Sequence, residues 1–165
     1  MKAAIVGAAI IVALALQTST FLGRQGTGID LVLVVVIWTA LQFGPATGLL
    51  TGAAAGLAQD VLSGGGIIGV GGFAKTLVGF GAGVLGSQFI VAGSLPRFVV
   101  LVVGAAVNEI VFLGMYAAIE RRGFDMPWKQ AGIRALTTAV VGIALMIASN
   151  AIPAFLMRRR LRRGY

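Results

Sequence analysis

The 165-residue sequence contains no cysteine and no histidine. Without cysteine the chain has no disulfide, thiol nucleophile or thiolate metal ligand. Without histidine it lacks the commonest metal ligand and the usual proton carrier near neutral pH. The isolated charges within its apolar segments do not form a recognisable acid–base or nucleophile set. We therefore expect a protein that is not an enzyme, with no catalytic residues, no metal site and no cofactor.

Charged residues are also scarce. They make up 11% of the sequence, whereas 58% is hydrophobic, and the mean hydropathy is +0.99. Soluble domains average about 25% charged and ~45–50% apolar residues. The composition predicts an all-α polytopic membrane protein with about six transmembrane helices, because each span takes ~20 residues. No separate soluble domain fits into the remaining length.

Six apolar segments are separated by polar, proline or glycine breaks. Gly44 and Pro45 end the second segment, which at ~20–24 Å is shorter than the ~30 Å hydrocarbon core and is continued by neighbours or lies in a thinned bilayer. The glycine-rich stretch 63–72 is interpreted as a loop or a re-entrant segment. If the second and third segments formed one re-entrant unit, the count would be five. The predicted spans are residues 2–22, 31–43, 46–62, 73–92, 97–119 and 133–157.

The basic residues predict the orientation. With six spans, Lys2, Arg97 and five arginines of the tail lie on one side, and four bases lie on the other. Positive charge marks the cytoplasmic side, so both termini are predicted to be cytoplasmic. Residues 1–157 then form a single membrane domain, and residues 158–165 form a basic cytoplasmic tail. The predicted topology anchors are Arg158, Arg159, Arg160, Arg162 and Arg163.

Glycines recur every four residues on both sides of the 63–72 stretch. On a helix this spacing forms one stripe, and stripes of small residues let membrane helices approach closely. We interpret them as ridges that pack the third span against the fourth. In the alternative, one ridge faces the single membrane span of a partner protein. The ridges are Gly48, Gly52 and Gly56, followed by Asp60, and Gly79 and Gly83, preceded by Lys75.

Asp60 and Lys75 are charges inside apolar segments, where insertion costs about 2.5–3.5 kcal/mol at the bilayer centre. Counted along their helices at ~1.5 Å per residue, they lie at similar depth on adjacent antiparallel spans. Each also opposes the dipole of its own helix, so pairing would relieve both penalties. We predict a buried Asp60–Lys75 ion pair. Asp30, by contrast, precedes the second span at a position that favours its dipole.

Asn108 and Glu109 form an alternative buried polar group on the fifth span. Glu109 competes with Asp60 as a partner for Lys75 if the fourth and fifth spans are neighbours. One interpretation is a polar contact between helices, and the other is a docking site or a solvated cavity.

The order of features resembles a known bacterial family, the rod shape-determining protein MreD. The resemblance covers most of the chain and includes a basic tail after the last span. Its most specific piece is the pattern G-x-x-x-G-L-x-x-D-x-x-S at residues 52–63, followed by TLVG at 76–79. Ile29 departs from the family pattern, in which proline is frequent before the aspartate.

The resemblance implies a non-catalytic scaffold in the inner membrane that works in the cell-elongation complex. Its implied partners are MreC, which has a single span, the filament protein MreB, and a peptidoglycan polymerase with its transpeptidase; a homo-oligomer is possible. The family also looks similar in fold to the substrate-binding component of energy-coupling-factor vitamin transporters, which is the alternative function.

A vitamin pocket would need aromatic and hydrogen-bonding groups on the outer side. The chain offers few of them: Tyr116, Trp128, Asn108 and Glu109. This scarcity favours the scaffold.

Overall fold

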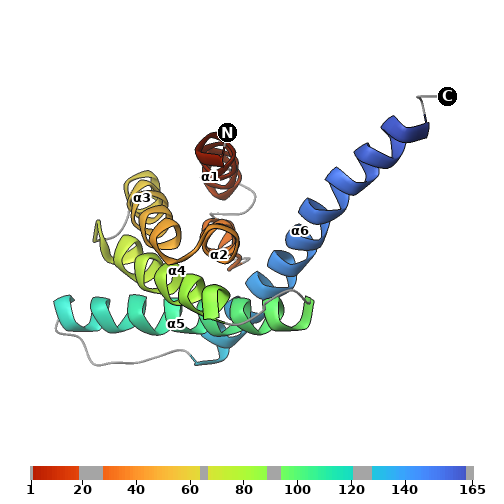
Figure 1. Ribbon diagram of the computed structural model, residues 1–165. Helices are drawn as coiled ribbons and strands as arrows, with labels where there is room; N and C mark the ends of the chain where they lie inside the picture. Colours follow the sequence, from red (N-terminus) through yellow and green to blue (C-terminus); the bar gives the residue numbers. More distant parts are fainter. Residues whose placement is uncertain (1, 19–27, 64–66, 89–93, 121–127, 163–165) are drawn as a thin grey trace.

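The computed structural model describes residues 2–18, 28–63, 67–88, 94–120 and 128–162, and it describes side chains from residue 6 to residue 148 within these ranges, apart from 94, 120, 128 and 130. The described residues form six helices and no strand, which confirms the predicted all-α class. Figure 1 shows α1 to α4 grouped together, with α5 crossing beneath them and the far end of α6 leading away. The helices are α1 (Lys2–Thr18), α2 (Leu31–Phe43), α3 (Pro45–Ser63), α4 (Val70–Gln88), α5 (Ser94–Glu120) and α6 (Trp128–Arg162).

The short helix α2 is the centre of the molecule and contacts all five other helices. Its two ends match the predicted bounds because both are set by local chemistry. Asp30 caps its N-terminus by accepting a hydrogen bond from the Leu33 backbone N–H at 2.9 Å. Gly44 ends it with a φ of 91°, a conformation that favours glycine. Because neighbouring helices cover α2, its short length does not have to match the bilayer.

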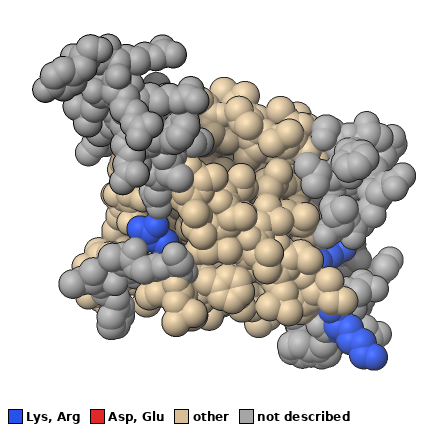
Figure 2. All heavy atoms as spheres, turned by 90° about the vertical axis from the view of Figure 1, so that its right-hand side faces the viewer, with Lys and Arg blue, Asp and Glu red and all other residues tan. Residues whose placement is uncertain are grey.

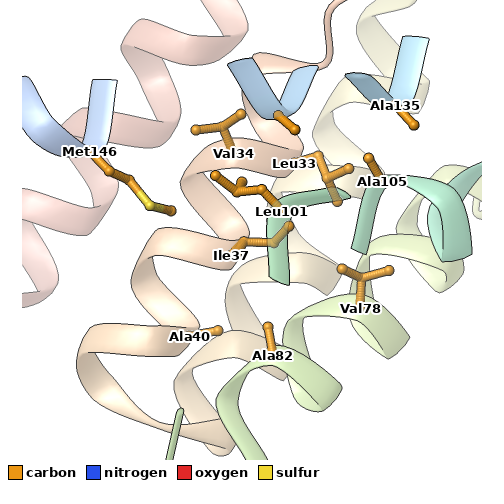
Figure 3. Packing of buried hydrophobic residues seen from close by; sticks show 11 residues of the cluster. Leu33, Val34, Ile37, Ala40, Val78, Ala82, Leu101, Ala105, Ala135 and Met146 are labelled. Carbon is orange, nitrogen blue, oxygen red and sulfur yellow. The ribbon is translucent and has the colours of Figure 1, made fainter. Parts of the chain in front are cut away.

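The main core lies where α2, α4, α5 and α6 meet (Figure 3). Leu33, Ile37 and Leu101 are almost fully buried there. Alanines of α2, α4, α5 and α6 fill the remaining space, so the helices pack closely around these larger side chains. A second cluster joins α1, α2 and α3 around Val32 and Val36.

Three helical stretches are long and apolar enough to cross a membrane: Val70–Gln88, Leu95–Ile119 and Ala131–Ala148. Val6–Thr18 and Leu31–Phe43 are shorter apolar helices. Within the described residues, α3 meets neither description, because glycines and the Gln59–Asp60 pair dilute its apolar character. That all six helices cross the bilayer therefore stays a prediction.

The molecular surface fits a membrane protein. Valines 99, 103 and 107 of α5 are 38–52% exposed at four-residue spacing, which gives that helix an apolar outer stripe. Figure 2 shows another face, on which the described residues are almost all uncharged and no acidic side chain is visible.

Several boundaries differ from those expected. Helix α4 begins at Val70, so the last three residues of the predicted 63–72 loop are helical. Helix α6 continues to Arg162, so its backbone is helical into the predicted tail at 158–165. Residues 19–22 and 89–92 of the predicted spans lie outside the described residues.

Candidate functional site

The glycine ridges of α3 and α4 face each other along the hairpin. A Cβ on Gly48 would overlap the Gly79 carbonyl, and a Cβ on Gly52 would overlap the Lys75 carbonyl. At Gly56 it would lie 2.6 Å from the Gly72 Cα. Only glycine permits such close backbone contact, so the ridges are the packing surface between α3 and α4.

All five ridge glycines are buried, and those of one helix meet the backbone of the other. In this arrangement neither ridge exposes a glycine surface that could face the membrane span of a partner protein. The glycines are Gly48, Gly52, Gly56, Gly79 and Gly83.

Asp60 lies near the end of α3 and caps the start of α4. Its Oδ2 accepts hydrogen bonds from the backbone N–H groups of Gly69 at 2.9 Å and Gly72 at 3.1 Å. The carboxylate therefore lies at the positive end of the α4 dipole. Gly69 has a φ of 103°, which favours glycine at the turn into the helix. This cap is why α4 begins three residues before the predicted position.

Lys75 pairs with Asp30, and not with Asp60 as the sequence predicted. The Lys75 Nζ lies 2.8 Å from Asp30 Oδ2, and the two side chains are 5% and 19% exposed. Helix α4 turns the backbone of Lys75 toward Gly52 of α3, so its side chain extends to α2 instead. The residue count that predicted the Asp60–Lys75 pair gave the depth of Lys75 along α4 but not the direction of its side chain.

The N-terminus of α2 is held by three other helices. From α1, the Gln17 side chain donates to the Ile29 carbonyl at 2.8 Å and accepts from the Leu31 N–H at 2.9 Å. From α6, the Thr138 hydroxyl accepts from the Asp30 N–H at 3.1 Å. From α4, Lys75 binds the Asp30 carboxylate. We call these four residues, Gln17, Asp30, Lys75 and Thr138, the Asp30 hub.

Glu109 and Arg134 extend the charges of the hub to α5 and α6. Glu109 interacts electrostatically with Arg134, Asp30 and Lys75, so two acids and two bases share one region. The neighbouring Asn108 is 5% exposed, and its Oδ1 has no hydrogen-bond partner within the described part of the chain. Glu109 thus lies near Lys75, as considered from the sequence, but Asp30 holds the ion pair.

The other predicted site residues lie apart from the hub. Tyr116 accepts a hydrogen bond from the Ile67 N–H at 2.8 Å and packs on Phe112, with ring centroids 4.8 Å apart. Its hydroxyl thus anchors the residues that precede α4. The side chains of Trp128 and of the tail arginines 158–163 lie outside the described residues.

Sequence reasoning missed Gln17, Thr138 and Arg134 as members of this region. The available signal was a polar residue within or at the edge of an apolar segment, a position where an unsatisfied group is costly. The resulting arrangement pairs or caps its charges and joins four helices, which suits a rigid clamp. Among the described residues, no group of three or more aspartates and glutamates could hold a metal ion.

A comparison with known families places this geometry in context. The model of a family described as rod shape-determining protein MreD matches residues 3–129, more than three quarters of the chain. The chain belongs to the MreD family. It is therefore a membrane component of the MreBCD shape system and takes part in determining rod shape. The family is a structural component of that system and is not a known enzyme family.

The match to the MreD family covers helices α1 to α5 and ends at the start of α6. It includes Asp30, Lys75 and Glu109, whereas Arg134 and Thr138 lie beyond it. No curated protein and no solved structure shows a significant match to the chain. The expected likeness to the substrate-binding component of vitamin transporters stays a prediction.

Proposed function

We propose that this chain is a non-catalytic scaffold of the inner membrane that binds MreC and helps to organise peptidoglycan synthesis. Membership in the MreD family supports a role in rod shape, and the way in which the buried charges are used supports the finer role. MreB and a peptidoglycan polymerase with its transpeptidase would be further members of the same assembly. The chain could also associate with a second copy of itself.

The observation that carries this proposal is the Asp30 hub. Its hydrogen bonds and its ion pair connect α1, α2, α4 and α6 at one end of the bundle. Charged groups that are paired between helices are not available for acid–base chemistry. Their interactions instead hold the surface formed by these helices in one geometry. A preorganised surface binds a partner at a lower entropic cost, which is what a scaffold requires.

The orientation is part of the proposal. If the N-terminus is cytoplasmic, as the basic residues predict, α1 runs outward and Gln17 near its end lies toward the outer side. The Asp30 hub then lies on the outer half of the membrane domain. The basic residues at 158–163 lie in the cytoplasm, where anionic lipids attract them.

Co-purification tests the proposal. The full chain is expressed with MreC from the same genome, extracted in mild detergent and isolated through a tag on one protein. We expect a stable complex for the wild-type chain and for Lys129→Gln, an exposed position outside the hub. Asp30→Asn is expected to reduce the complex although the protein is still produced.

The opposite results are equally clear. A folded, monodisperse wild-type chain that captures no MreC contradicts the proposal. If the same preparation instead retains a small vitamin tightly, the vitamin-binding alternative is correct. Loss of the complex in Lys129→Gln but not in Asp30→Asn would show that the hub does not shape the binding surface.

A further inference from the structure

An apolar groove of about 400 Å³ runs between α1, α2 and α6. Ala8, Val12 and Leu16 line it from α1, Leu31 and Trp38 from α2, and Leu145 from α6. Val12, Leu16 and Leu145 are 47–57% exposed, so the groove is open along its side. Figure 1 shows that α6 leads away from α1 here. Figure 2 shows a few basic side chains and no acidic side chain on the described part of the face in view.

The length of the groove limits what it can hold. Its α1 wall extends from Ala8 to Leu16, which is ~12 Å at 1.5 Å per residue. One leaflet of the hydrocarbon core is ~15 Å thick, half of the ~30 Å total. A membrane-spanning helix needs the whole thickness, so it would extend far beyond the groove at one end. A chain confined to one leaflet matches the length.

The chemistry of the walls points the same way. All the residues that line the groove are apolar apart from the indole of Trp38. Its Nε1 is buried and has no hydrogen-bond partner in the described part of the chain. A polar ligand would find almost nothing to bond with, whereas hydrocarbon loses nothing by lying against these side chains.

A cationic side chain lies beyond one end of the groove. Leu31 marks that end, next to Asp30, whose N–H donates to Thr138 of α6. Arg134 lies one turn before Thr138, and its side chain covers Gly28. Arg134 is exposed, and although Glu109 of α5 interacts with it electrostatically, a guanidinium has five N–H donors to share. The carboxylate of Asp30 is already paired with Lys75.

We propose that the groove binds one acyl chain of an anionic glycerophospholipid, whose phosphate is held by Arg134. The apolar walls recognise the chain, the length restricts it to one leaflet, and the guanidinium selects the charge. Such a site would tie the α1–α2–α6 side of the scaffold to lipid of one charge type.

Trp38 makes the groove directly measurable. The sequence has two tryptophans, so Trp128→Phe leaves Trp38 as the only indole. Bromine atoms on an acyl chain quench tryptophan fluorescence on contact. In proteoliposomes of this variant, brominated phosphatidylglycerol is compared with phosphatidylethanolamine that carries identical brominated chains. We expect half-maximal quenching by the anionic lipid at a mole fraction ~5-fold lower, as one basic residue would produce.

Two pairs of variants test the two parts of the site. Val12→Phe fills the groove and should weaken quenching by both lipids, whereas Ile11→Phe, an exposed neighbour on α1 that does not line the groove, should not. Arg134→Gln should remove the preference for the anionic lipid and keep quenching, whereas Lys129→Gln should retain the preference. Monodisperse elution and an unchanged melting temperature show that each variant is folded. Ala8→Leu is the second groove-filling variant if Val12→Phe does not fold.

Three results would overturn the proposal. Equal quenching by both lipids in the Trp128→Phe protein would mean that Trp38 meets only bulk lipid. Quenching that Val12→Phe and Ala8→Leu leave unchanged would place the chain elsewhere. The absence of quenching by either lipid would show that protein fills the groove. None of these results depends on MreC, so they are distinct from a failure of the scaffold proposal.

Discussion

The α3–α4 hairpin and the α1–α2–α6 side both contain rows of small residues, but they use them in opposite ways. In the hairpin, each of the five ridge glycines lies against backbone of the opposite helix, and no space for a side chain remains there. On the other side, Ala8 and its neighbours on α1 line an open groove. A row of small residues therefore forms a close helix contact where another helix packs against it, and lines a cavity where the neighbouring helix diverges.

The Asp30 hub connects these two regions. Lys75 belongs to the closed hairpin, and its side chain leaves it to reach Asp30 of α2, where Gln17 and Thr138 also bind. The tightly packed pair thereby supports the position of the helices around the groove. If the two regions differ in this way, the hairpin is intolerant of added atoms, the open side is tolerant of them, and loss of the hub weakens the connection between the two.

The largest effect is expected for Gly52→Ile in the hairpin. A Cβ at this position would overlap the backbone of Lys75 and Thr76, which cannot move without separating α3 from α4. We expect a loss of more than ~4 kcal/mol, seen as little folded, monodisperse protein after detergent extraction. Gly81→Ile on α4 is the matched control, because no heavy atom lies within 4 Å of its Cβ position. Equal stability of the two variants would contradict the closed hairpin.

Asp30→Asn should have the next largest effect. It leaves the Lys75 ammonium, 5% exposed, without its carboxylate, and breaking a buried pair costs ~3–5 kcal/mol. We expect a loss of about 3 kcal/mol in a reversible unfolding titration, because Asp30 itself remains partly exposed. The double variant Asp30→Asn with Lys75→Met removes both charges and should recover part of this loss. A single variant as stable as the wild type would show that the ion pair does not support the fold.

Local chemistry made several parts of this structure predictable from the sequence. Both ends of α2 were predicted because an aspartate cap and a Gly-Pro break act on adjacent residues. The glycine ridges were predicted because four-residue spacing fixes one helix face. The start of α4 was missed, since its cap comes from Asp60, ten residues earlier in the chain.

The partner of Lys75 was missed for a different reason. Counting residues gives the depth of a residue along its helix. The direction in which its side chain points depends on which neighbouring helix lies against its backbone. Gly52 brings α3 against the Lys75 backbone, and this contact turns the side chain toward Asp30. The groove could not be predicted from the sequence either, because it depends on how far α6 diverges from α1.

Asp60→Asn is expected to cost only about 1 kcal/mol. An amide oxygen can still accept from the backbone N–H groups of Gly69 and Gly72, so only the charge at the α4 N-terminus is lost. Asp60→Leu removes the acceptor as well and should cost about 2 kcal/mol or more. The same unfolding titration measures both. A larger loss for Asp60→Asn than for Asp30→Asn would mean that Asp60, and not Asp30, carries the principal charge interaction.

The smallest effect is expected for Ala8→Leu on the open side. This change adds more carbon atoms than a Gly→Ala change in the hairpin, yet the new side chain enters the groove, where Ala8 is exposed. We expect the unfolding free energy to stay within about 0.5 kcal/mol of the wild type, as for other changes away from close packing. Gly52→Ala, which adds one methyl group, is the comparison and should be clearly less stable. If Ala8→Leu were the more damaging of the two, the groove would be closed in the folded protein, and the contrast between the two regions would disappear.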